Sequence, residues 1–230
     1  MIFDPVYFLF MIPGMLLSMW ASAKTKSAFN KYSKVRSARG LTGAQAAQYM
    51  LDRAGIRDVT VKPTQGFLSD HYNPVTKSLA LSQPVYSSTS IAAIGVACHE
   101  AGHAIQHAEN YAPLWLRSAI VPAVNLGSSL SWFVLMGGFL LNSAGLIYAG
   151  IALFGLVVLF QLVTLPVEFD ASSRARKLAV AQGIVSPQEE VGMGKVLNAA
   201  ALTYVAAAIS SILTLLYFLM RAGLLGGRDD

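Results

Sequence analysis

Charged side chains are scarce in this chain of 230 residues. Asp, Glu, Lys and Arg make up 13% of it, against about 25% in typical soluble domains. Three stretches contain none of these residues: 5–23, 118–167 and 196–220. Because a bilayer span needs roughly 20 apolar residues, the outer stretches each fit one span and the middle stretch fits two. This composition argues against a soluble domain and predicts a membrane protein.

Four transmembrane helices follow from these stretches, with a turn near Asn142 and Gly145 dividing the middle one. They are expected at about residues 5–23, 114–140, 144–166 and 199–220. Asp4 precedes the first apolar core and Lys24 follows it, whereas a signal peptide carries its positive charge before the core. The first span is therefore expected to be an uncleaved anchor.

The basic residues are distributed unevenly between the segments that join the spans. Ten of the 17 Lys and Arg lie in residues 24–113, four more lie in 167–198, and only Arg221 and Arg228 follow the last span. Cytoplasmic loops carry such an excess, so both large loops are expected on the cytoplasmic side of the inner cell membrane. This asymmetry also accounts for the net charge of +5 without a nucleic-acid partner.

Cysteine and histidine are rare as well. The single cysteine, Cys98, excludes an intrachain disulfide and is expected to be a small buried helix residue rather than a nucleophile. Three of the four histidines, His99, His103 and His107, fall within nine residues. Such clustering in a chain poor in histidine points to a site.

The two large loops indicate a small α+β portion. A capping residue at Thr42 predicts a helix that stops near Gly55, residues 58–62 read as a strand, and residues 67–82 read as a β-hairpin. The fold class is thus a mainly α membrane protein of about four transmembrane helices with a small cytoplasmic α+β portion. We expect five segments: anchor 1–23, cytoplasmic portion 24–113, transmembrane hairpin 114–166, cytoplasmic segment 167–198, and last helix with tail 199–230.

Residues 99–103 read H-E-A-G-H within an apolar run that predicts a helix. On a helix, residues four apart share a face, so His99 and His103 can reach one metal ion. Glu100 can touch a metal-bound water without being a ligand. The motif therefore predicts two metal ligands and a general base.

A third protein ligand is needed to complete such a site. His107 lies about 80° around and roughly 12 Å along a straight helix from His99, and no Gly or Pro between His103 and His107 would break that helix. Glu168 lies where the third span meets the cytoplasm, a costly place for an acid unless it faces protein, metal or water. We therefore expect Glu168 to be the ligand. Asp170 is expected to pair with Arg174, four residues on.

The segment 99–107, with Glu168 and the residues up to Ala171 downstream, resembles the bacterial neutral zinc metallopeptidases of the YugP-like family. The resemblance extends over nearly the whole chain. At one remove, the layout is similar to heat-shock membrane zinc peptidases and CAAX prenyl proteases. The resemblance implies that the cytoplasmic portion 24–113 is a zincin-like metallopeptidase portion. It also implies one Zn²⁺ per chain held by His99, His103 and Glu168 in a gluzincin-type site, with Glu100 as the base.

The wider clan often has Asp four residues after the ligand Glu, where it can hold a ligand histidine. Ser172 stands there in this chain and would accept a hydrogen bond without charge. His71, Tyr72 and Arg174 are candidates for stabilising the oxyanion. The strand Leu79, Ala80 and Leu81 could be an exposed edge that pairs with an extended substrate; an internal strand is the alternative.

The expected activity is hydrolysis of peptide bonds in polypeptide or membrane-protein substrates, with a role in membrane-protein quality control suggested by the remote relatives. A catalytically silent zinc-binding scaffold and a metal transporter are the alternatives. An intact Glu100 argues against a scaffold. The lack of ionisable groups in 118–167 and 196–220 argues against a transporter, because a transport path needs such groups.

Overall fold

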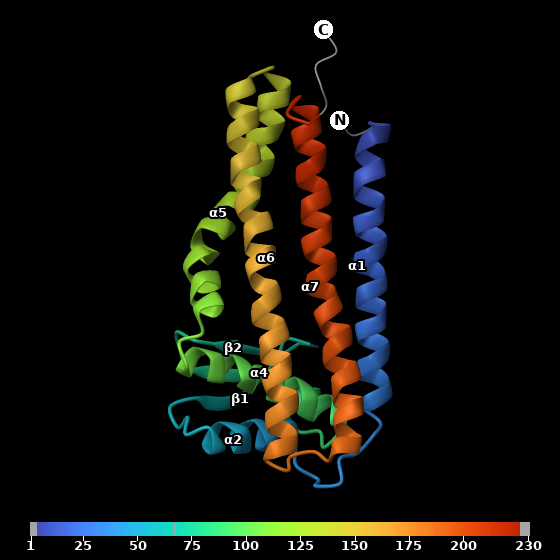
Figure 1. Ribbon diagram of the computed structural model, residues 1–230, viewed down its shortest axis with the longest axis vertical. Helices are drawn as coiled ribbons and strands as arrows, with labels where there is room; N and C mark the ends of the chain where they lie inside the picture. Colours follow the sequence, from blue (N-terminus) through green and yellow to red (C-terminus); the bar gives the residue numbers. More distant parts are fainter. Residues whose placement is uncertain (1–3, 67, 226–230) are drawn as a thin grey trace. The chain divides into compact units, whose positions relative to one another are not determined.

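The computed structural model describes residues 4–66 and 68–225. Long helices dominate these residues, and three short strands form one small sheet (Figure 1). This confirms the expected fold class of a mainly α membrane protein with a small α+β portion. In chain order the elements are α1 Pro5–Tyr32, α2 Gly43–Arg53, β1 Thr60–Thr64, β2 His71–Asn73, β3 Ser78–Ser82, α3 Gln83–Tyr86, α4 Ile91–Ala108, α5 Ala112–Leu140, α6 Ala144–Ala181 and α7 Pro187–Arg221.

The chain forms two compact units. The first comprises the described residues of 1–21, 116–165 and 203–230, and the second comprises the described residues of 22–115 and 166–202. The sheet and helices α2, α3 and α4 all belong to the second unit. The five expected segments remain predictions, because the compact units group residues by contact rather than by their side of a membrane.

The first unit is built from apolar helix segments. Helices α1, α5, α6 and α7 are long and apolar enough to cross a membrane, as expected. Large apolar side chains such as Leu9 and Phe133 are exposed, at 71% and 77%, which suits contact with lipid. Gly14 of α1 lies against α7, where an added Cβ would be 2.8 Å from the Ser210 hydroxyl. Glycine therefore permits a close approach of these two helices.

Three of these helices extend beyond the apolar stretches that predicted them. Helix α1 continues to Tyr32, α6 runs through Pro166 to Ala181, and α7 begins at Pro187. In the second unit the extended part of α6 buries a stripe of small residues at intervals of four: Ala171, Ala175 and Ala179. The helix continues there because small side chains at helical spacing pack in the protein interior, not because the segment is a long apolar stretch.

The sheet of the second unit has the order β1-β3-β2, with β1 parallel and β2 antiparallel to β3. Strands β2 and β3 form the expected hairpin. The Asn73 side chain accepts hydrogen bonds from the backbone N–H groups of Val75 and Thr76 and so stabilises its turn. Phe67, the first residue of the expected hairpin, lies outside the described residues.

Strand β3 is the central strand, so the expectation that Leu79, Ala80 and Leu81 form an exposed edge is wrong. These side chains are at most 2% exposed, and β1 pairs along the side that would have been free. An uninterrupted apolar run is typical of a strand buried on both faces. The outer strands of the sheet are β1 and β2.

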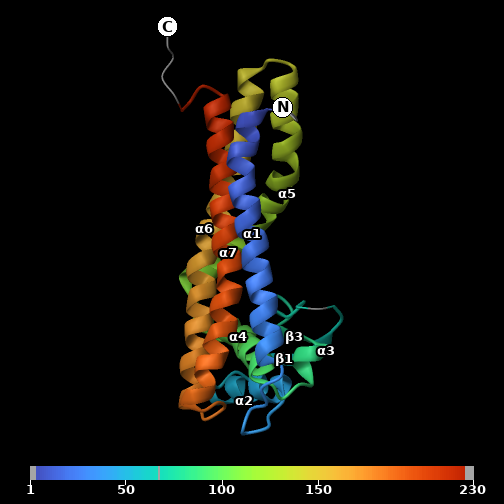
Figure 2. The same ribbon diagram turned by 90° about the vertical axis from the view of Figure 1, so that its right-hand side faces the viewer.

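Helix α4 forms the core of the second unit. The Ser90 hydroxyl accepts a hydrogen bond from the Ala93 N–H at 3.2 Å and caps its start. The helix packs against α2, β2 and β3, and Figure 2 shows it from the side together with the sheet and the short α3. Fourteen of its 18 residues are buried, so most side chains on it are surrounded by packed neighbours.

Candidate metal centre

His99 and His103 lie one turn apart on α4 and face the same side. Their ring centroids are 4.7 Å apart and the rings are nearly perpendicular, at 81°. Glu100 follows His99 directly and is 8% exposed, as is His103. The helix therefore delivers two imidazoles and a carboxylate to one buried region of the second unit.

Glu168, on the part of α6 that belongs to the second unit, lies against both imidazoles. Its Oε2 is 3.2 Å from His99 Nε2 and 3.6 Å from His103 Nε2. The carboxylate is nearly inaccessible, with the residue 2% exposed. The structure thus brings Glu168 together with His103 and with His99, which lies 69 residues earlier in the chain.

The donor atoms of these three residues suit a zinc ion. In tetrahedral zinc sites with metal–ligand distances of about 2.0–2.1 Å, ligand atoms are about 3.3–3.5 Å apart. The two measured separations bracket this value, and one donor atom from each residue lies within 4.8 Å of the other two. His99, His103 and Glu168 could therefore hold a metal ion.

The opposite nitrogen of each imidazole is hydrogen bonded on the far side of the ring. His99 Nδ1 lies 3.1 Å from Ser172 Oγ, and His103 Nδ1 lies 3.0 Å from Gln106 Oε1. Ser172 is where the resemblance places a group that holds a ligand histidine. Gln106 was not anticipated, although a glutamine one turn after a ligand histidine on the buried face of a helix is a recognisable signal.

Glycine at position 102 lets α4 and α6 approach closely. A Cβ added to Gly102 would be 2.7 Å from the backbone oxygen of Ala171. Gly102 precedes His103, and Ala171 lies three residues after Glu168. This glycine therefore fixes the spacing of the two helices that carry the candidate ligands.

The surroundings of α4 shift the pKa values of two of its residues. Burial lowers the pKa of His103, but the hydrogen bond to Glu168 and the charges of Glu100 and Glu168 outweigh it, so the pKa is raised. Burial alone raises the pKa of Cys98 to about 12. Cys98 is therefore a buried, protonated thiol, consistent with the role expected for it.

The other candidates are placed outside the three-residue cluster. His107 Nδ1 lies 2.8 Å from the hydroxyl of Tyr72 on β2. His71 is exposed, and its Nδ1 lies 2.8 Å from the backbone oxygen of Ser69. Arg174 forms ion pairs with Asp170 and Glu109; the pairing with Asp170 was expected.

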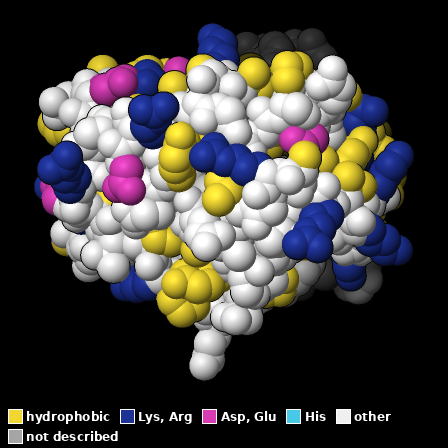
Figure 3. Space-filling model, turned by 90° about the horizontal axis from the view of Figure 1, so that it is seen from below, with side chains coloured by type: hydrophobic (Ala, Val, Ile, Leu, Met, Phe, Trp, Pro, Cys, Tyr) yellow, Lys and Arg dark blue, Asp and Glu magenta, His cyan; other side chains and the backbone are white. Residues whose placement is uncertain are grey.

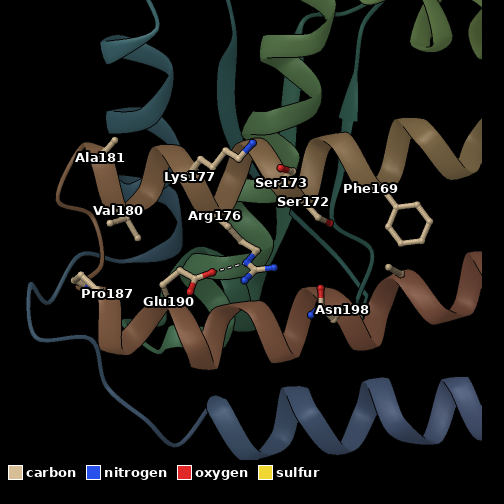
Figure 4. Close-up of a pocket in the computed structure, with 11 residues that line it drawn as sticks. Phe169, Ser172, Ser173, Arg176, Lys177, Val180, Ala181, Pro187, Glu190 and Asn198 are labelled. Carbon is tan, nitrogen blue, oxygen red and sulfur yellow. Dashed lines mark hydrogen bonds and ion pairs between the residues drawn. The ribbon is translucent and has the colours of Figure 1, made fainter.

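Helices α6 and α7 line a groove of about 700 Å³ in the second unit (Figure 4). Arg176 and Glu190 form an ion pair across it, and Phe169 and Ala201 contribute apolar surface. Ser172, whose hydroxyl contacts His99 Nδ1, is also one of the residues that line the groove.

A histidine pair in an HExxH helix, a buried glutamate from a second helix and four helices of membrane-spanning length together define the class of membrane zinc metallopeptidases. The chain belongs to the family described as "Putative neutral zinc metallopeptidase", whose model matches residues 7–223. This confirms the family resemblance drawn from the sequence.

A curated relative from Bacillus subtilis (strain 168) is named "Putative membrane protease YugP". It is 52% identical over 219 residues, which cover 95% of this chain and 96% of the relative. No solved structure was found to match the chain. Family and relative support a zinc metallopeptidase and a membrane location, and both agree with the cluster of three candidate ligands.

Proposed function

We propose that this protein is a zinc-dependent endopeptidase that hydrolyses peptide bonds of polypeptide or membrane-protein substrates at the cytoplasmic face of the inner cell membrane. One observation carries the proposal: the Nε2 atoms of His99 and His103 converge on Glu168 Oε2 at zinc-like separations, with Glu100 on the same helix. One zinc ion per chain would bind there.

Zinc held by these residues would supply a Lewis acid that activates water and polarises the scissile carbonyl. Glu100 is the carboxylate available for proton transfer, because Glu168 is engaged by both histidines. Its charge acts on His103, which places it in the electrostatic environment of the ligands. We assign Glu100 to take a proton from the attacking water and pass it to the leaving amine.

The outer edge of the sheet supports a way of binding substrate. Strand β2 is an outer strand, and it packs against α4, the helix that carries Glu100. An extended polypeptide could add to this edge through backbone hydrogen bonds, with Tyr72 on the strand beside it. Recognition through the backbone favours flexible or unfolded segments over particular side chains.

The charge distribution supports the cytoplasmic assignment. Fourteen of the 17 Lys and Arg lie in the second unit, which contains the cluster. Figure 3 shows Lys and Arg side chains spread over one face of the molecule, with some Asp and Glu side chains among them. By the positive-inside rule, this distribution supports a cytoplasmic location for the unit. Tethering to the membrane favours membrane-protein substrates, in line with a role in quality control.

Replacing Glu100 with Gln tests the proposal. The variant should still bind about one zinc per chain, because the three ligands are intact, while cleavage of an unfolded casein-like substrate should fall by about 10²–10⁴-fold. Zinc is measured by atomic emission on purified protein, and cleavage is measured by release of labelled peptides. Asp52→Asn, the same chemical change at an exposed site on α2, should leave both unchanged.

Two outcomes separate the alternatives. If Glu100→Gln cleaves at the wild-type rate, the assignment of the base is wrong. If wild-type protein binds zinc and leaves every unfolded substrate intact, the silent scaffold is the better description. In that case Glu100→Gln would be indistinguishable from the wild type in all assays.

A further inference from the structure

Gln106 is a polar side chain with no exposed surface, one turn beyond His103 on α4. Its amide makes three hydrogen bonds. Oε1 lies 3.0 Å from His103 Nδ1, and Nε2 donates to the Val167 backbone oxygen at 2.9 Å and to Asp170 Oδ2 at 2.8 Å. Burying such an amide costs free energy unless its polar groups form hydrogen bonds. Here both the oxygen and the NH₂ group form them.

The partners of Gln106 determine which way its amide faces. The Val167 carbonyl can only accept, and the Asp170 carboxylate accepts from Arg174 as well. Both therefore require the NH₂ end of the amide. Turning the amide over would set two acceptors against its oxygen and leave His103 facing an NH₂ group. The oxygen must therefore face His103.

An amide oxygen can only accept a hydrogen bond. His103 Nδ1 must therefore carry the proton, and the lone pair of a neutral imidazole is then on Nε2, the atom that faces Glu168. His99 is held differently, because the Ser172 hydroxyl can either donate to its Nδ1 or accept from it. Of these two histidines, His103 is the one whose tautomer is dictated by its neighbour.

We propose that Gln106 is a positioning residue that locks His103 in the Nδ1–H tautomer, so that Nε2 is presented as a metal ligand. Asp170 and Arg174 act through it: Arg174 pairs with Asp170 and Glu109, and Asp170 holds the amide. This inference rests on the metal site of the proposed function. Groups that hold a ligand histidine typically change metal affinity by about 10–100-fold.

Two changes at position 106 distinguish positioning from packing. Gln106→Met keeps the length of the side chain and removes the acceptor. Gln106→Glu combined with Asp170→Asn keeps an acceptor for His103 and avoids two carboxylates side by side. The new carboxyl group, buried and protonated, can donate its O–H to the Val167 carbonyl in place of the amide N–H. Positioning predicts zinc affinity about 10–100-fold weaker for the methionine variant and within a few-fold of the wild type for the double variant.

A purely structural role predicts the reverse order, because methionine suits a buried site better than a carboxylate. The affinity is measured by competition with a chelator, independently of cleavage, on purified full-length protein. Thermal unfolding of the metal-free proteins serves as the measure of packing. Gln48→Met, a surface glutamine on α2, is the matched control and should bind zinc as the wild type does.

The outcomes are distinguishable. If the wild type binds zinc and Gln106→Met binds it equally tightly, or more tightly than the double variant, the inference is wrong while the proposed function stands. If the wild type binds no zinc, both are overturned. The predicted order of affinities, with folding retained in all proteins, would establish Gln106 as the positioning residue.

Discussion

At the scale of single residues, the cluster depends on how side chains are turned rather than only on which residues are present. Both histidines direct Nε2 toward Glu168 and Nδ1 toward a neighbouring side chain. Glu168 is almost completely buried. Burying its charged carboxylate costs free energy unless a cationic partner lies beside it. A bound zinc ion or a protonated histidine would meet that requirement.

Removing Glu168 should therefore affect metal binding far more than removing the fourth histidine of the chain. Glu168→Ala deletes a candidate ligand, and zinc affinity should fall by more than about 100-fold. His107→Ala deletes a hydrogen bond and a ring contact with Tyr72 and should retain zinc. Competition with a chelator measures both. Loss of zinc in His107→Ala with retention in Glu168→Ala would move the third ligand to His107.

Most of the candidate site could be predicted from the sequence, because His99, Glu100 and His103 lie within one short segment. Residues four apart on a helix share a face, and an acid at the end of a span is conspicuous. Gln106 was missed because its role depends on Val167 and Asp170 of α6, which reach it only when two helices pack. Leu79 and its neighbours were misassigned because the neighbours of a strand are set by the sheet, here by β1.

At the scale of elements, α4 and α6 meet at a contact that tolerates no side chain. The backbone oxygen of Ala171 lies 2.7 Å from the position that a Cβ at residue 102 would take. The helices could be predicted because long apolar stretches and capping residues can be recognised within a short segment of sequence. Their full lengths do not follow from those signals, since the second unit continues α6 to Ala181 by packing small residues.

Gly102→Ala should push these helices apart. The added Cβ would be 2.7 Å from a backbone atom, and such overpacking costs about 1–3 kcal/mol. Because the candidate ligands lie on both helices, zinc affinity should fall together with the unfolding temperature. Gly155→Ala on α6, where nothing lies within 4 Å, is the control and should change neither. Unaltered zinc affinity in Gly102→Ala would show that the cluster does not depend on this spacing.

At the scale of the whole molecule, the two compact units differ in composition. The first unit contains the apolar helix segments, and the second holds most of the charge, the sheet and the cluster. The positions of the spans were predictable because lipid demands length and apolarity. The pairing order of the three strands was not, because the parallel contact of β1 with β3 joins segments that no turn connects.

Membrane orientation can be tested with single cysteines in a Cys98→Ala background. Val75 lies between β2 and β3 and is 91% exposed, and Leu141 lies between α5 and α6 and is 69% exposed. A membrane-impermeant maleimide should label Leu141→Cys in intact cells. Val75→Cys should be labelled only after permeabilisation. The opposite pattern would place the cluster outside the cell.

The order of the chain has a consequence for synthesis. His99 and His103 leave the ribosome before the uncharged stretch 118–167, and Glu168 follows directly after that stretch. If His99, His103 and Glu168 are the ligands, a nascent chain whose residues 118–168 have not yet been synthesised offers zinc only two of its three ligands. The hydrolytic centre would thus be incomplete during translation, and the protease would become competent only once the segment destined for the bilayer has been made.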